Sequence, residues 1–560
     1  MNRPRMLLES LAAMILVAAL ALCAPAVPGQ AKAANASSTA ASSSDPVLQA
    51  MLEELARSKS LKMENVPPPY YIEYRISDVD EYDADAAFGA LRTSHRTRAR
   101  VLRAVVRVGD YKQDSYFGSG MGQAEIVPLD DDPLALRRQI WLATDNAYKA
   151  ASEALTAKQA LLKEYTADQP VDDFAHAPVV NSIGPLAVLE VDPKHWEGML
   201  EQASALFRTD PQVESLETSL RFQALNQYFV NSEGTVTRQG SLSYVMTISG
   251  ATQAADGMRL ERSPYTMTAS LKELPTPEQF LADTVKMLDT IKKLRDAPVV
   301  EEEYRGPVIF APDAASDVFA SLVGTNAAGR KPRPGESART TGGFAASYKS
   351  RVLPDFLSVI DDPTLATFQG HTLAGAYQID DEGVKASTVH VIQDGELVNY
   401  LLGREPIRDF PASNGHGRAG PGAPPFPSTA VLIVQAKAPL APEDLKKKML
   451  EMCHNAGKPY GYIVETLGPR LSPRLLYRVW EKDGREELVR GAVFNELDVR
   501  TLRNDLVAAG SDAEASNKEG PLPNTVICPS VLFDELEVKR IDTKNSKLPE
   551  YPPPPLAASH

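Results

Sequence analysis

A strongly capped helix and the charged segment after it divide this chain into two halves. Thr276 is typical of a helix N-cap, Pro277 suits the first helical position, and Gln279 completes a capping box. Apolar residues then recur at helical spacing, at Leu281, Val285, Leu288 and Ile291. The next segment, DAPVVEEEYR (296–305), is typical of a linker. We therefore predict an N-terminal and central region at 47–295, a linker at 296–305 and a C-terminal domain at 306–541.

The first half combines strand patterns with long helical patterns. Alternation of polar with aromatic and β-branched residues predicts strands over 70–88 and 97–117. Runs rich in Ala, Leu, Lys, Glu and Gln predict helices over 134–165 and 195–207. Two further strands, 220–234 and 240–253, would meet at a hairpin turn.

The second half is mostly strand patterns. A strand at 306–310 and a helix at 311–324 open it, and a Gly/Arg/Ser-rich loop follows at 329–343. A single later helix is predicted, at 442–457. We therefore expect a two-domain α+β fold, with mixed strands and long helices first and a mostly antiparallel sheet after them.

The N-terminus has the features of a cleavable signal peptide, predicted over 1–33. Arg3 and Arg5 precede an uncharged apolar run, LAAMILVAALALCAPAV (11–27), and an A-x-A pattern follows at 31–33. We therefore expect export to the periplasm or the extracellular space.

A membrane anchor and a lipid anchor are the alternatives for this segment. A spanning helix needs about 20 apolar residues, and Pro25 and Pro28 interrupt the run early. Lipid attachment at Cys23 is less favoured, because Leu22 stands where a small residue is normally needed.

The remaining composition describes a globular protein between two polar ends. A Ser/Ala-rich linker (34–46) and a Pro-rich tail (542–560) flank it, and no second apolar run approaches membrane-spanning length. The net charge is −14, and no basic block exceeds three residues. Because phosphate backbones are bound by clustered cations, we do not expect a nucleic-acid partner.

Familiar catalytic motifs are absent from the sequence. There is no His-Glu dipeptide, which excludes H-E-x-x-H-type zinc sites, and no G-x-S-x-G element. The segment GHGRAG (415–420) satisfies G-x-G-x-x-G, but PGAPPFPS follows it. A dinucleotide site needs a helix at that point, so we reject this interpretation.

Several polar residues are open to a structural or a functional interpretation. The acidic clusters at 361–362 and 380–382 lie where strands turn, so backbone capping is favoured over a metal site. Cys453 lies in register with apolar helix positions, and Cys528 lies in an apolar run, so burial is favoured for both. One disulfide between them stays open. His416 lies in a Gly-rich loop, where we do not expect a core position.

Ordered motifs in the second half resemble the TldD/PmbA metallopeptidase family. They are GPVIFAPDAASDVFASLVG, LSVIDDPT, IDDEGVKASTVHVIQDGELVNYLLGRE, SNGHGR, RVWEKDGREELVRG and ICPSVLFDELEV. The strand pairs at 71–108 and the segment YFVNSEGTVTRQ resemble the family's N-terminal domain more loosely. The resemblance implies a TldD/PmbA-like α+β fold over most of 47–540.

The resemblance also implies that this chain lacks the family's metal site. TldD-type subunits carry H-E-x-x-x-H on the helix after the GPVIF-like strand, and Ala320, Ser321 and Thr325 stand at those positions here. Two imidazoles would hold the metal and the Glu would be the base. No catalytic residue and no cofactor is therefore expected, and zinc would need non-standard ligands or a partner's ligands.

Three functional hypotheses follow from the resemblance. The first is a non-catalytic, PmbA-type subunit, inactive alone, that pairs with an exported TldD-type chain and binds peptides. The second is a metallopeptidase with relocated ligands, drawing on His416, Cys453, His454 or a nearby Asp. Independently of this hypothesis, His416, Asn414 and Arg418 are candidates for a binding cleft. The third is a homo-oligomeric envelope binding protein without catalysis.

Overall fold

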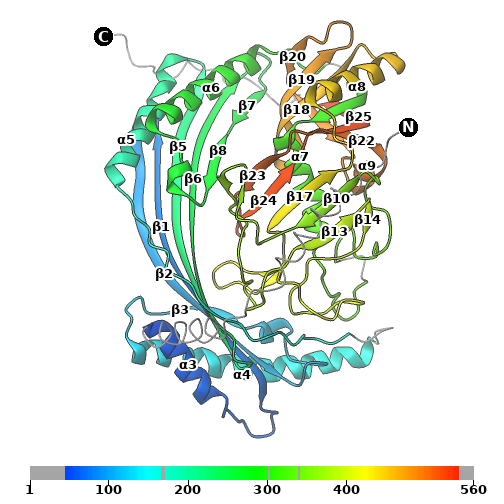
Figure 1. Cartoon of the computed structure of the whole chain (residues 1–560). Coiled ribbons are helices and arrows are strands. Elements are labelled where there is room, and N and C mark those ends of the chain that lie inside the picture. Colours follow the sequence, from blue (N-terminus) through cyan, green and yellow to red (C-terminus); the bar gives the residue numbers. More distant parts are fainter. Residues whose placement is uncertain (1–44, 166–170, 301–302, 338–340, 542–560) are drawn as a thin grey trace, which may run out of the picture.

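The computed structural model describes residues 45–165, 171–300, 303–337 and 341–541 (Figure 1). The predicted signal peptide, Cys23, nearly all of the predicted linker at 34–46 and the Pro-rich tail lie outside these residues. No helix in the described part is long and apolar enough to span a membrane.

One long twisted sheet organises the first half. Its four long strands are β1 (Pro69–Ala87), β2 (Ala90–Val108), β5 (Val213–Asn231) and β6 (Val236–Gln253). The order is β3-β2-β1-β5-β6-β4, with β7 and β8 also paired to β6. The short strands are β3 (Gln123–Ile126), β4 (Asn181–Ile183), β7 (Arg259–Arg262) and β8 (Tyr265–Thr268). The predicted hairpin turn is confirmed, because Asn231 accepts from the backbone of Gly234 and Thr235 between β5 and β6.

Alternation along the long strands gives this sheet a mostly apolar face and a mostly polar face. Along β1, Ile72, Tyr74, Ile76, Tyr82, Ala84 and Ala86 are all buried against helices. The residues between them, such as Glu73, Arg75, Glu81 and Asp83, point to the other face, because side chains alternate along a strand. That charged face is turned toward the second half of the chain (Figure 1).

Four helices cover the apolar face, two at each end of the long strands (Figure 1). One end carries α3 (Pro46–Ser58) and α4 (Pro133–Glu164), and the other carries α5 (Pro193–Ser204) and α6 (Pro277–Asp296). The capping box of α6 at Thr276 and Gln279 is confirmed. Helix α3 begins at Pro46, where the predicted linker at 34–46 ends, because the Asp45 carboxylate accepts from the N–H groups of Val47 and Leu48.

The second half contains two sheets around one large core. The first has the order β20-β19-β18-β9-β25-β21, with β22 paired to β25, and the second has the order β14-β13-β10-β17-β24-β23. Pairing is antiparallel except for β9 with β18 and β17 with β24. The first sheet comprises β9 (Tyr304–Phe310), β18 (Tyr460–Gly468), β19 (Ser472–Trp480), β20 (Glu486–Val489), β21 (Ala492–Asn495), β22 (Leu506–Ala509) and β25 (Val531–Arg540). The second comprises β10 (Leu357–Asp361), β13 (Val389–Gln393), β14 (Glu396–Leu397), β17 (Val431–Ala436), β23 (Glu514–Lys518) and β24 (Asn524–Cys528).

Short elements complete the second half. The helices are α7 (Pro312–Phe319), α8 (Pro442–Asn455) and α9 (Val499–Asp505). Two-residue strands pair as β11 (Thr367–Phe368) with β12 (His371–Thr372), and β15 (Gly417–Arg418) with β16 (Phe426–Pro427). The α+β architecture with a mostly antiparallel second half is therefore confirmed.

The segment predicted as a linker at 296–305 is docked along its described part. Asp296 is the last residue of α6, and Tyr304 and Arg305 already belong to β9. Between them, Val300 donates to the carbonyl of Arg490, whose Nε donates to the carbonyl of Ala297 at 2.9 Å. These contacts tie the end of α6 to the segment between β20 and β21.

Candidate functional site

The helix after β9 holds the three positions at which the family resemblance places metal-site residues. Helix α7 ends at Phe319, and Ala320–Gly324 form one turn of π-helix. The N–H of Thr325 donates to the carbonyl of Ala320. In a π turn, residues five apart are joined by a hydrogen bond and lie above one another, whereas in an α-helix they diverge by roughly 140° around the axis. Positions 320 and 325 therefore share one side of this helix, as two ligands of one ion would need to.

Close packing at Gly324 accompanies this turn. A Cβ on Gly324 would lie 3.0 Å from Cγ2 of Thr429, just before β17. Val323 is fully buried, while Ser321 and Thr325 are exposed. The turn thus presents positions 321 and 325 outward, but their side chains are hydroxyls, and Ala320 has no donor atom.

His416 is fully buried, so the expectation that its loop lies outside the core is wrong. Its Nε2 lies 3.3 Å from Oδ1 of Asp361, and its Nδ1 lies 3.0 Å from Oδ1 of Asn414. Gly415, at φ 79°, makes the turn that directs the ring inward. Asp361 also accepts from the backbone of Ala430, 3.1 Å away at Oδ2. The ring therefore joins its own loop to the end of β10 and the start of β17.

The other two cleft candidates, Asn414 and Arg418, are also committed to internal hydrogen bonds. The Asn414 amide donates to the carbonyl of Tyr400 and accepts from the N–H of Leu402, each at 2.8 Å. The guanidinium of Arg418 donates to the carbonyls of Thr429 and Pro523. The structure brings the three candidates together as a scaffold, and none of them lines either of the two hollows described below.

The remaining ligand candidates are dispersed. Cys453 is buried beside Leu445 and Met449 on α8, as its register predicts, and burial raises the pKa of its thiol to about 11. His454 points outward to Glu481, 3.0 Å away. Cys528 is buried in β24, and burial raises its pKa as well. Both cysteines are free thiols. Across the described ranges, no three His, Cys, Asp or Glu side chains are grouped so as to hold an ion.

The acidic turn at 380–382 has the backbone-capping role favoured from sequence. Asp380 Oδ1 accepts from the N–H groups of Glu382 and Val384, and its Oδ2 accepts from Gly417. Glu382 Oε2 accepts from the N–H of Arg404 at 2.6 Å. Burial raises the pKa of Asp380, and it raises that of Glu382 to about 7.

Arginines join this turn and its neighbouring loops to the charged face of the long sheet. Arg75 donates to the carbonyls of Asp381 and Ala423. Arg103 donates to the carbonyl of Gly422 at 2.7 Å. The two halves are thus held by cations of β1 and β2 that reach backbone carbonyls of the second half.

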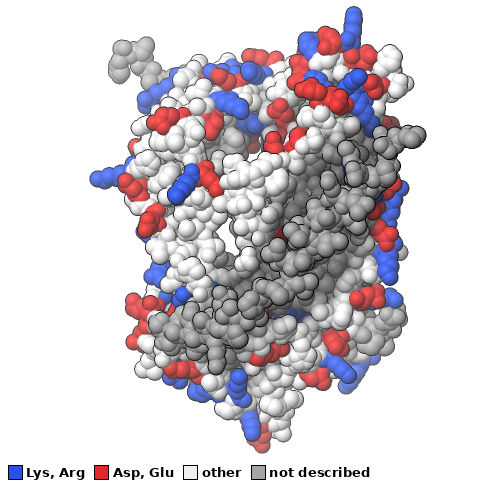
Figure 2. Space-filling model, viewed as in Figure 1, with Lys and Arg blue, Asp and Glu red and all other residues white. Residues whose placement is uncertain are grey.

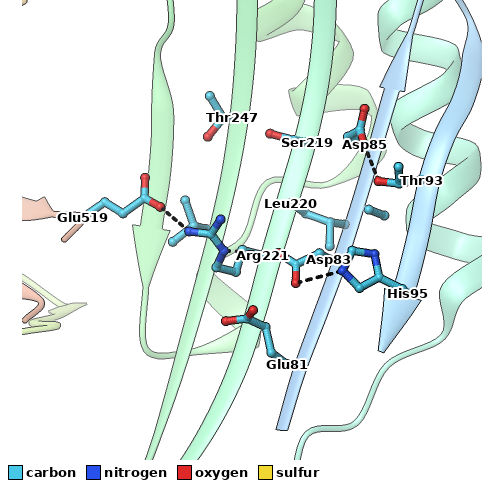
Figure 3. A pocket seen from close by; sticks show the side chains of 12 residues that line it. Glu81, Asp83, Asp85, Thr93, His95, Ser219, Leu220, Arg221, Thr247 and Glu519 are labelled. Atoms are coloured by element: carbon cyan, nitrogen blue, oxygen red, sulfur yellow. Dashed lines mark hydrogen bonds and ion pairs between the residues drawn. The ribbon is translucent and has the colours of Figure 1, made fainter. Parts of the chain in front are cut away.

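A first hollow, which we call the sheet hollow, lies on the same charged face (Figure 3). Its volume is about 410 Å³. Arg221 lies 3.1 Å from Asp83 and 3.2 Å from Glu519, so it links the sheet to the segment after β23. His95 points toward Asp83, and Asp85 accepts from Thr93. Each of these charges has an opposite or hydrogen-bonding partner.

A larger hollow, which we call the central cleft, lies between the two halves and has a volume of about 830 Å³. Strands β7 and β8 line it from the first half, and α7, β12, the β18–β19 turn and β23 line it from the second. Figure 2 shows Lys and Arg side chains interspersed with Asp and Glu on the viewed face. The residues of the cleft used below are Glu261, Arg262, Glu273, Asp313, Asp317, Thr372, Thr466, Gly468, Arg474 and Lys518.

The central cleft and the π turn share one helix. Asp313, Asp317 and Ser321 are four residues apart along α7 and its extension, so they follow one face. Lys518 Nζ lies 2.6 Å from Asp317 and 3.6 Å from Asp313. The sequence analysis did not single out Asp313 and Asp317. Their spacing of four residues, one helical turn before position 321, would have indicated two carboxylates on one face of this helix.

Comparisons with known proteins agree with this architecture. Residues 303–540 match the family model described as the PmbA/TldA metallopeptidase C-terminal domain. Over 177 residues the chain is 30% identical to the metalloprotease PmbA of Escherichia coli O157:H7. That alignment covers 31% of this chain and 35% of the relative, so the chain spans about a third of that curated protein.

Solved structures extend the similarity to nearly the whole chain at the level of fold. A candidate modulator of a DNA gyrase from Thermotoga maritima has a TM-score of 0.60 at 15% identity, covering 88% of this chain and 99% of that one. TldE from Thermococcus kodakarensis has a TM-score of 0.56 at 13% identity, covering 87% and 99%. A candidate modulator of DNA gyrase from Bacteroides thetaiotaomicron has a TM-score of 0.58 at 13% identity, covering 89% and 98%. Residues 303–540 of this chain are therefore similar to the PmbA/TldA metallopeptidase C-terminal domain, and the wider chain shares the fold of these solved structures.

Proposed function

We propose that this chain is an exported, PmbA-like subunit that performs no metal chemistry itself and supplies peptide-binding surface to a TldD-type metallopeptidase partner. The observation that carries the proposal is the π turn at Ala320–Gly324. Its geometry would place two ligands on one side of the helix, yet the residues there are Ala320 and Thr325. Zinc is held by imidazole, thiolate or carboxylate groups, and none of these stands at 320, 321 or 325.

The central cleft supports a peptide as the bound species. Within the described residues, strand β23 is a terminal strand of its sheet, and β7 and β8 each pair with β6 alone. An extended peptide can add to such strand edges through backbone hydrogen bonds. The cleft also runs along the face of α7 that leads to the π turn, so a peptide lying in it would approach positions 321 and 325.

The proposed export constrains the partner. The N-terminal run with Arg3 and Arg5 supports passage through the inner membrane. A catalytic partner must then be exported as well, and it would carry the H-E-x-x-x-H motif on the helix that corresponds to α7.

The test is to express the full chain with its own leader, alone and together with an exported H-E-x-x-x-H chain from the same genome. Mass spectrometry of the recovered protein would locate the N-terminus, elemental analysis would measure bound zinc, and a mixed peptide library would report hydrolysis. We expect no stoichiometric zinc and no cleavage by the chain alone, and a stable complex that cleaves peptides with the partner.

Two outcomes would contradict the proposal. Stoichiometric zinc with robust cleavage by the chain alone would make it an enzyme with non-standard ligands. Recovery of a homo-oligomer without any family partner would leave a binding protein without catalysis.

A further inference from the structure

Two arginines that line the central cleft, one from each half of the chain, have unused hydrogen-bond donors, and we call this pair the arginine wall. Arg262, at the end of β7, donates from Nη1 to Oγ1 of Thr466 at 2.7 Å. Its Nε is buried and has no hydrogen-bond partner within the described part of the chain. Arg474, in β19, makes no hydrogen bond or ion pair to any described residue. A guanidinium carries five N–H donors, so most donors of this pair are unoccupied.

The other charged groups of the cleft are already partnered. Asp313 and Asp317 face Lys518, and Glu261 lies 2.6 Å from the Nε of Arg259. Glu273 accepts from the backbone N–H of Thr372. The guanidinium groups of the arginine wall are therefore the charged groups of the cleft that have no carboxylate partner and have unoccupied N–H donors among the described residues.

Electrostatics at this wall favour an incoming anion. Burial is the main cause that lowers the pKa of Arg262. Glu465, Tyr477 and Asp313 act in the opposite direction, and the charge of Arg474 lowers the pKa by a smaller amount. Neither carboxylate lies within ion-pair distance of Arg262. A partly buried cation with unoccupied donors is stabilised in its charged form when an anion binds to it.

Gly468 contributes to the position of Arg474. A Cβ at residue 468 would overlap the Nε of Arg474, so the guanidinium lies directly against the backbone of this glycine. Both residues line the central cleft. An added methyl group would move the guanidinium without removing its charge, which provides a geometric test.

We propose that Arg262 and Arg474 form a carboxylate-binding subsite in the central cleft, which takes a carboxylate of an extended peptide. The inference takes from the proposed function only that the cleft binds a peptide, and it does not depend on any partner chain. A planar carboxylate matches the fork of a guanidinium in two parallel hydrogen bonds. Asp313 and Asp317, which line the same cleft, disfavour ligands with several negative charges, so a monoanion fits better than a phosphate.

The experiment measures fluorescence anisotropy of a fluorescein-labelled peptide of alternating threonine and valine with the purified full chain. Three forms are compared: one with a free C-terminal carboxylate, one with a C-terminal amide, and an amide with one internal glutamate. We expect the wild type to bind at least one carboxylate form about tenfold more tightly than the plain amide. The peptide form that binds more tightly shows whether the subsite binds a C-terminal carboxylate or a glutamate side chain.

Matched variants connect this preference to the arginine wall. Arg262→Gln and Arg474→Gln are expected to abolish it, and Gly468→Ala is expected to reproduce the effect of Arg474→Gln while keeping the charge. Arg305→Gln is the control, because Arg305 is exposed on β9 and pairs with Glu535. Thermal unfolding of each variant confirms that it is folded, and the three independent changes keep the test valid if one fails to fold.

Equal affinity for acid and amide forms, or a preference that survives Arg262→Gln and Arg474→Gln, would overturn the subsite. Failure of every peptide form to bind would overturn it too. Neither result would affect complex formation with an exported partner, which co-purification tests separately.

Discussion

Arg404 lies 2.8 Å from Glu233, which joins the second half of the chain to the turn between β5 and β6. The same guanidinium donates to the carbonyl of Ala175 at 2.7 Å and to the hydroxyl of Tyr71 at 3.2 Å. Its side chain is 1% exposed. One buried cation of the second half is therefore satisfied entirely by groups of the first.

Arg404→Gln is expected to destabilise the junction between the halves. The change leaves the Glu233 carboxylate without its cation, and breaking one partner of a buried pair costs about 3–5 kcal/mol. Urea unfolding followed by fluorescence would show a lower midpoint. Arg408→Gln is the control, because Arg408 is 70% exposed and its loss is expected to cost less than about 0.5 kcal/mol. Equal midpoints for the two variants would contradict the assigned role.

Glu382 is expected to make the stability of the chain depend on pH. Burial raises its pKa from 4.5 to about 7, so between these values the folded chain keeps a proton that the unfolded chain releases. The free energy of unfolding therefore falls as pH rises through this window, by on the order of 3 kcal/mol.

Glu382→Gln removes this titration while keeping the shape of the side chain. Its stability relative to wild type should increase from about pH 5 to about pH 8 in urea unfolding. The matched control is Glu451→Gln on α8, where the side chain is 64% exposed. Parallel pH profiles for wild type and Glu382→Gln would show that this carboxyl group does not titrate as described.

His416→Ala is expected to reduce stability and leave peptide binding intact. Both ring nitrogens lie within hydrogen-bond distance of oxygens of Asp361 and Asn414. Loss of the ring leaves a buried carboxylate short of a hydrogen-bond partner, at a cost of about 1–3 kcal/mol. Thermal unfolding and peptide anisotropy would measure the two effects. His454→Ala, at an exposed position on α8, should change neither. Unchanged stability with lost peptide binding would instead indicate a binding role for His416.

The π turn can be tested by placing ligands on it. In Ala320→His/Thr325→His, the two imidazoles would lie on one side of the helix, because the turn aligns positions five apart. Zinc in roughly ten- to hundredfold excess over Kd is expected to stabilise the variant by about 1–3 kcal/mol. Ala320→His alone provides one imidazole and should show no such shift. A zinc response equal in the single and double variants would mean that the two positions do not face one ion.

Local chemistry made many elements predictable. The Thr276 cap, the turn at 231–234, the register of Cys453 and the capping role of Asp380 each depend on residues close in sequence. The helix predicted at 311–324 is present as α7 followed by the π turn at Ala320–Gly324.

Contacts between distant segments were not predictable in the same way. His416 is buried against Asp361, which lies 55 residues away in the sequence and is within hydrogen-bond distance of its ring. The sequence around His416 does not indicate this partner. Arg262 and Arg474 come from different halves and meet only because β7 and β19 line one cleft. The π turn was missed because the sequence at 320–324 has no feature that distinguishes it from an ordinary helix end.

The long strands have a consequence for how the first half can be divided. Strand β1 has 19 residues, which span roughly 60 Å, and its buried side chains belong to both apolar clusters, one under α3 and α4 and one under α5 and α6. A truncation that removes β1 therefore removes buried side chains from both apolar clusters. We therefore expect that no fragment cut from within residues 69–253 folds autonomously, and that protease nicks in this span lead to loss of the entire first half rather than release of a stable piece.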